Sequence, residues 1–226
     1  MSKTIEDIIN DATNVVATAK RFDSEAQFQF ELAWEINNQI KQNALNWQVN
    51  LEYKIAEYKF NGKTAKVFTD ILLKDDTTKE YIPIELKHKL PSAPANLGRF
   101  DFWWDVHRIE WLYDTSLEIE NKKSNISYKE LKISESLTFD GYSFKCGYAI
   151  MLTNDKRYWT ASTNIVSKNF QLIGVVGGKL YWFFGTKKNK SIPDSWRDVD
   201  ITLKNTYTCD WKQAFGISKY LILKVK

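Results

Sequence analysis

The hydrophobic pattern of the chain changes its period at about residue 47, and this change restricts the fold more than any other feature. Between Ser24 and Gln42 an apolar residue recurs every four positions, which is typical of a helix with one buried face: Phe28, Leu32, Ile36 and Ile40. Ser24 followed by Gln27 is typical of the start of such a helix. From Trp47 onward apolar and polar residues alternate, which is typical of strands.

The alternating region predicts a three-stranded meander between helices. We expect its strands over Gln48–Phe60, Thr64–Leu73 and Glu80–Leu90, with Asn61-Gly62 as a hairpin turn. Two further helices are expected, one over Thr4–Thr18 and an aromatic one over Asn96–Tyr113. Residues 114–143 are expected to form a polar connection with one or two short strands. Further strands are expected over Gly147–Leu152, through Trp182 and over Tyr220–Val225. This order predicts an α+β (α/β) fold with a mixed sheet.

Composition excludes several classes of protein. With 43% hydrophobic residues and 9 Trp, 11 Tyr and 13 Phe, the 226 residues suffice for one domain, 1–226, with a substantial core. No apolar stretch approaches the roughly 20 residues of a membrane helix, and the first residues lack a signal-peptide pattern. Cys146 and Cys209 are too few for a disulfide framework or a zinc site. We therefore expect a cytoplasmic protein with no membrane association.

The segment from Tyr81 to His88 contains the main candidate site residues. In a strand, alternation places Ile84 and Leu86 on one face and Glu85 and Lys87 on the other. The preceding expected strand carries one acid, Asp70, in an apolar run. If the two strands form a hairpin, Asp70 lies beside Glu85 and Lys87.

Two neighbouring carboxylates repel each other, so a divalent cation is their natural partner. Oxygen ligands favour Mg²⁺ or Mn²⁺ over zinc. Such a cation stabilises charge on a phosphate and lowers the pKa of a bound water, which Lys87 could orient. The alternative is a structural ion pair of Lys87 with Glu85 or Asp70, but the spacing of the acids and the upstream helix favour a site.

Asp70, fourteen further residues and then Glu85-Leu86-Lys87 resemble the D-x(n)-E-x-K signature of the PD-(D/E)XK nuclease superfamily. The resemblance covers about residues 22–160. It implies a restriction-endonuclease-like fold, a central mixed sheet flanked by helices, with Asp70, Glu85 and the Leu86 carbonyl binding Mg²⁺ (or Mn²⁺) and Lys87 assisting the hydrolytic water. Thr69 stands where the signature has Pro, which leaves the metal ligands unchanged.

Members of this superfamily often place a glutamate of the first helix near the metal. The candidates here are Glu25, Glu31 and Glu35. On a helical wheel Glu25 lies in the middle of the apolar stripe, with Gln29 beside it, whereas the other two lie toward its edge. A core-facing acid needs a partner, so we favour Glu25. The alternative is that Glu25 only stabilises the helix N-terminus.

The aromatic helix also carries charged residues. Asp101 and Asp105 are expected to form ion pairs on its surface, and His107 is expected to be packed in the core. His88 faces away from Glu85 by alternation, so we assign it no catalytic role.

The first helix, the Arg-x-Asp and Asp-x-x-Arg-x-Glu runs of the aromatic helix and the segment Leu152–Asp155 are similar to a set of uncharacterised bacterial proteins within this superfamily. Arg99 and Arg108 are therefore candidate phosphate or structural contacts, and Gln29 is a further candidate contact to nucleic acid. The lysine clusters at 122–123 and 187–190 are expected to be solvated, with contact to a nucleic-acid backbone as the alternative.

The resemblance and the site residues together predict a Mg²⁺-dependent nuclease that hydrolyses phosphodiester bonds, with DNA favoured over RNA. The formal net charge of +4 is compatible with nucleic acid as the partner but does not require it. A homodimer stays open. The alternative function is a module of the same fold that binds nucleic acid or protein without cleaving.

Overall fold

The computed structural model describes residues 3–60, 63–92, 94–115, 142–162, 170–181 and 200–226. Its helices are α1 (Ile5–Ala19), α2 (Glu25–Gln42) and α3 (Ala95–Thr115), with a short 3₁₀ helix η1 (Lys156–Tyr158). Its strands are β1 (Trp47–Phe60), β2 (Lys63–Asp75), β3 (Glu80–Lys89), β4 (Ser143–Phe144), β5 (Gly147–Thr153), β6 (Gly174–Tyr181), β7 (Asp200–Cys209), β8 (Lys212–Gln213) and β9 (Lys219–Val225).

The main sheet is mixed, as the sequence predicts. Its strand order is β1-β2-β3-β5-β9-β8, with β4 paired alongside β3. Strands β1 to β3 form the expected antiparallel meander, β5 runs parallel to β3, and β9 runs antiparallel to β5. The described part of the chain therefore has the predicted α+β class.

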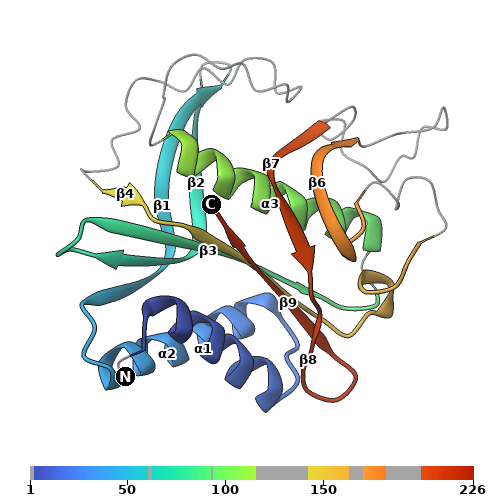
Figure 1. The fold of residues 1–226 in the computed structure, drawn as a ribbon, viewed down its shortest axis with the longest axis horizontal. Coiled ribbons are helices and arrows are strands. Elements are labelled where there is room, and N and C mark those ends of the chain that lie inside the picture. Colours follow the sequence, from blue (N-terminus) through green and yellow to red (C-terminus); the bar gives the residue numbers. More distant parts are fainter. Residues whose placement is uncertain (1–2, 61–62, 93, 116–141, 163–169, 182–199) are drawn as a thin grey trace.

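Helices cover both faces of this sheet. Figure 1 shows α1 and α2 below it and α3 with β6 and β7 on the opposite side. On β5 the residues Tyr148 and Ile150 pack in the α1–α2 layer, while Ala149 and Met151 pack in the α3 layer. All seven residues of β5 are buried, as expected for a strand with both faces covered.

The first two helices begin where their sequences predict. Thr4 and Asp7 form a reciprocal capping box at the start of α1. At α2 the Ser24 side chain accepts a hydrogen bond from the Gln27 backbone N–H, but the Gln27 side chain accepts from Asp23 rather than from Ser24. The cap of α2 is thus only half of the predicted box.

Two strands of the described residues were not predicted from the sequence, β7 and the two-residue β8. β7 pairs with β6 in a separate two-stranded sheet, and this sheet packs on α3 through Ile201, Leu203 and Tyr207. These residues alternate with polar ones, but Thr, Lys and Asn dominate the segment and hide the apolar face.

In the connection predicted over 114–143, the only described strand residue is Ser143, in β4. The lysine clusters at 122–123 and 187–190 lie outside the described residues.

No helix in the described ranges is both long and apolar enough to cross a membrane.

Gly147 allows β5 to start in a crowded place. A Cβ at this position would collide with the Ile109 side chain of α3 and lie 3.1 Å from the Pro83 carbonyl oxygen of β3. We expect Gly147→Ala to lower the free energy of unfolding by about 1–3 kcal/mol through overpacking, measured by urea denaturation. Stability equal to that of wild type would show that α3 can move away from β5 at little cost.

Candidate active site

The β2–β3 hairpin brings the predicted acids together. Its ladder ends where Ile71 pairs with Ile84, so Asp70 and Glu85 are the next residues on the two strands. Ile84 packs in the α1–α2 layer, which places Glu85 on the α3 side of the sheet. Beyond the end of the ladder, the Asp70 Oδ2 atom accepts a hydrogen bond of 2.6 Å from the Leu86 backbone N–H. The carboxylate thus bridges the gap between the strands.

Thr69 has a structural function at the end of this ladder. It is fully buried, and its hydroxyl donates a hydrogen bond of 3.2 Å to the Ile84 carbonyl oxygen across the hairpin. This bond ties β2 to β3 immediately beside Asp70. The departure from Pro at this position therefore supplies a cross-strand contact that Pro cannot make.

Of the three candidate glutamates on α2, Glu25 is the one directed at the hairpin. Its Oε2 atom accepts a hydrogen bond of 2.7 Å from the His88 backbone N–H at the end of β3. Glu31 instead pairs with Lys20 at 2.6 Å, and Glu35 accepts a hydrogen bond of 2.8 Å from Gln39. Glu25 also lies close enough to Asp70 to raise the pKa of that carboxyl.

Gln29 lies one turn further along α2 and braces the site. Its Nε2 atom donates to the Asp70 backbone carbonyl at 2.7 Å and to Glu52 Oε1 at 2.8 Å. Glu52 has a positive φ of 48°, which is uncommon for a residue other than glycine. The structure thus gives Gln29 a supporting contact, and its expected contact with nucleic acid stays a prediction.

Helix α3 supplies partners that the sequence analysis did not foresee. Asp105 Oδ2 lies 2.6 Å from Lys87 Nζ, and Arg108 Nη2 lies 2.5 Å from Glu85 Oε2. Asp105 is only 4% exposed, so its predicted place in a surface ion-pair stripe is wrong. Asp101, one turn earlier, lies 3.6 Å from Lys89 and is partly buried. The sequence contains Glu-x-Lys on a strand and Asp-x-x-Arg on a helix, but their pairing depends on how α3 packs on the sheet.

Burial makes both hairpin acids hard to ionise. Desolvation raises the pKa of Glu85, although Arg108 opposes the shift, and Asp105 and Asp70 add to it. Desolvation also raises the pKa of Asp70 to about 6, opposed by the Leu86 N–H and by Lys87. Burial alone would lower the pKa of Lys87, but Asp105 outweighs it and the net shift is upward. Burial and, to a smaller extent, the neighbouring carboxylates therefore oppose ionisation of both acids, while Lys87 stays protonated.

The charge and the ligand atoms of this site decide whether it suits the divalent cation that the resemblance implies. The side chains gathered at the hairpin carry a formal charge of −2: four carboxylates (Glu25, Asp70, Glu85, Asp105) against two cations (Lys87, Arg108). Glu85 Oε1 is buried without a hydrogen-bond partner, as a free ligand atom would be.

The described residues contain no cluster of three or more His, Cys, Asp or Glu side chains suited to a metal. Mg²⁺ commonly binds through one or two carboxylates and keeps several waters, so Asp70, Glu85 and the Leu86 carbonyl suit Mg²⁺ or Mn²⁺ better than an ion that needs a full protein cage.

Two further residues of α3 have structural contacts. Arg99 is 3% exposed and donates a hydrogen bond to the backbone carbonyl of Arg157. Of the two roles expected for Arg99, a phosphate contact or a structural contact, the structure shows the structural one. Glu110 is 1% exposed and accepts hydrogen bonds from the Lys204 and Asn205 backbone N–H groups and from the Tyr207 hydroxyl. Glu110 thereby fixes β7 on α3.

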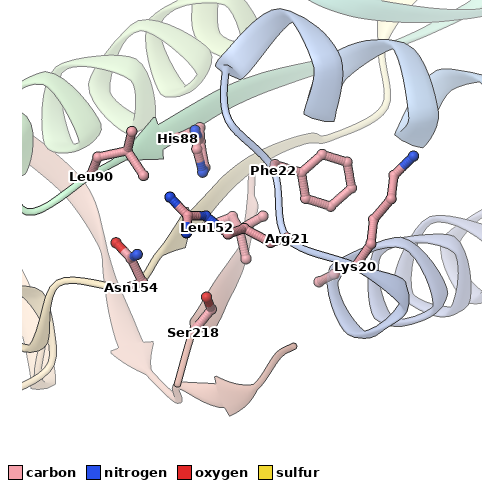
Figure 2. Close-up of a pocket in the computed structure, with 9 residues that line it drawn as sticks. Lys20, Arg21, Phe22, His88, Leu90, Leu152, Asn154 and Ser218 are labelled. Atoms are coloured by element: carbon pink, nitrogen blue, oxygen red, sulfur yellow. The ribbon is translucent and has the colours of Figure 1, made fainter. Parts of the chain in front are cut away.

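His88 and His107 lie outside the acid cluster. His88 lines a small cavity of about 10 Å³ with Phe22, Leu152 and Asn154, where α2 begins and β3 and β5 end (Figure 2). Burial lowers the pKa of His88, so it is neutral at neutral pH. His107 is half-buried beside β7, with Nδ1 3.0 Å from the Thr202 carbonyl oxygen.

Comparisons of the chain with family models, with curated proteins and with solved structures gave no match.

Proposed function

We propose that this chain is a nuclease of the PD-(D/E)XK type, dependent on Mg²⁺ or Mn²⁺, which hydrolyses phosphodiester bonds in the cytoplasm, with DNA favoured over RNA. The observation that carries the proposal is the convergence of Asp70, Glu85 and Lys87 at the end of the hairpin ladder, with Glu25 reaching the same place from α2. A mixed sheet with helices on both faces agrees with the restriction-endonuclease-like fold that the resemblance implies.

The site residues have distinct roles in this proposal. Asp70, the free Oε1 atom of Glu85 and the Leu86 carbonyl would hold the cation, which supplies charge for the phosphate and lowers the pKa of a bound water. Lys87 Nζ lies 3.2 Å from the Leu86 carbonyl oxygen and is held by Asp105. Because the pKa of Lys87 is raised, its ammonium donates hydrogen bonds and does not accept a proton at neutral pH. Lys87 therefore orients the water and stabilises negative charge.

A second candidate is a module of the same fold that binds nucleic acid or protein without cleaving. The observation in its favour is that both Glu85 and Lys87 already have counter-ions on α3. In that case the charges would serve only to fasten α3 to the sheet.

Metal binding separates the two candidates. For a nuclease, adding Mg²⁺ or Mn²⁺ to protein freed of metal with EDTA should raise the melting temperature of wild type, since a ligand that binds the folded state stabilises it. Asp70→Ala should show little or no rise, and Glu31→Ala, which removes a carboxylate of α2 paired with Lys20, should respond like wild type.

A panel of labelled DNA and RNA, single- and double-stranded, then tests cleavage with each metal. No thermal shift and no cleavage with any substrate would favour the binding module.

A further inference from the structure

Arg108 contacts the same carboxylate, Glu85, that would bind the proposed cation. Its Nη2 atom lies 2.5 Å from Glu85 Oε2, in a contact with a carboxylate that is itself only 3% exposed. Glu85 therefore has one oxygen engaged by a guanidinium and one buried oxygen, Oε1, without a partner. A cation that took both oxygens would have to displace Arg108.

Arg108 has a second partner within reach. Its Nη2 atom is 3.7 Å from Asp105 Oδ1, while Asp105 Oδ2 holds Lys87 at 2.6 Å. Asp105 is one turn before Arg108 on the same helix, so a rotamer change can move the guanidinium toward Asp105 without moving α3. The Nε atom of Arg108 is buried and has no partner in the present contact. Release from Glu85 therefore need not leave Arg108 without a counter-ion.

The positive charge of Arg108 disfavours a cation bound to the same carboxylate. The hairpin site has a formal charge of −2 with Arg108 in place, and it would have −3 without that side chain. Two positive charges on one buried carboxylate repel each other strongly because the surroundings screen them poorly. Arg108 thus stabilises the metal-free site and opposes metal binding at the same time.

We propose that Arg108 is an internal counter-ion that competes with the divalent cation for Glu85, so that loss of Arg108 tightens metal binding. This inference rests on the proposed function and adds a regulatory contact to the same site. A side chain that merely fastened α3, or that supported the metal site, would give the opposite sign or no change in affinity.

The test is the dissociation constant of Mn²⁺, measured by isothermal titration calorimetry on EDTA-treated protein without nucleic acid. We expect Arg108→Gln to bind Mn²⁺ roughly tenfold more tightly than wild type, because a nearby positive charge has been removed. Arg108→Lys keeps the charge but loses the planar fork, so its gain should be smaller. Arg157→Gln is the matched control: it also removes one positive charge, but from a side chain 49% exposed and paired with Asp155, and its affinity should equal that of wild type.

The outcomes separate this inference from the function on which it rests. If wild type binds Mn²⁺ and Arg108→Gln binds it equally or less tightly, the competition is wrong and the metal site stands. If neither wild type nor Arg108→Gln binds Mn²⁺, both proposals are wrong. If circular dichroism shows that Arg108→Gln does not fold, Arg108→Lys decides: tighter binding supports competition, and equal or weaker binding overturns it.

Discussion

Asp70→Asn is expected to abolish cleavage while leaving the fold intact. The Asn side chain keeps an oxygen that can accept the Leu86 N–H bond made by Asp70 Oδ2, so the end of the hairpin ladder is preserved. The negative charge is lost, and with it the attraction to a cation. Removing one preorganised electrostatic group commonly costs roughly 10²–10³ in rate, and a metal ligand should cost at least as much. The measurement is cleavage of labelled DNA in Mg²⁺ and in Mn²⁺.

The same variant should gain stability in the absence of metal. The pKa of Asp70 is raised by burial to about 6, above its ordinary value near 3.8, so the folded state binds this proton more tightly than the unfolded state does. This residue's contribution to stability is greatest below pH 4 and is lost as the pH rises through about 6. At pH 8, Asp70→Asn should therefore be as stable as wild type or more stable, by up to about 3 kcal/mol.

Urea denaturation in EDTA at pH 4 and pH 8 measures this difference, which should grow with pH. Glu31→Gln serves as the control, because it removes a carboxylate of α2 that pairs with Lys20 on the surface. An Asp70→Asn protein that is clearly destabilised at pH 8 and still cuts nucleic acid would end the metal-site hypothesis.

The sequence predicted the faces of β3 because they depend on local geometry alone. Side chains alternate in any strand, so Ile84 and Leu86 had to face one layer, and Glu85 and Lys87 the other, whatever the rest of the chain does. The helical wheel predicted in the same way, from the period of a helix, that Glu25 lies on the core-facing side of α2. Strand and helix boundaries agree within about two residues for the same reason.

The partners on α3 could not be derived from local pattern. A wheel places Asp101 and Asp105 on one face of the helix, but it does not say whether that face meets water or a charged strand. Asp105 is buried because Lys87 stands opposite, and that pairing joins residues far apart in the sequence. β7 was missed for a related reason: its apolar face becomes visible only against α3, where Glu110 binds its backbone.

Asp105→Ala is expected to cause the largest loss of stability among single changes at the site. Lys87 would keep its charge in a place where its side chain is 17% exposed, and it would lose the carboxylate at 2.6 Å. Removing one partner of a buried ion pair commonly costs about 3–5 kcal/mol, and the residual exposure of Lys87 favours the lower end. Asp101→Ala is the matched control, one turn earlier on α3, with Lys89 at 3.6 Å; an exposed or loosely held pair contributes roughly 0–1 kcal/mol.

The double variant Lys87→Met/Asp105→Leu tests whether this pair is needed for stability or for function. Apolar residues of similar size often replace a buried ion pair with no loss of stability, so the double variant should recover most of what Asp105→Ala loses. It should nevertheless fail to cleave, because the ammonium that orients the water is gone. Urea denaturation and the cleavage assay on the same preparations give both readouts. If the free energy of unfolding of Asp105→Ala lies within about 1 kcal/mol of wild type, Lys87 binds water or another acid in the variant, and Asp105 is not needed to fix its position.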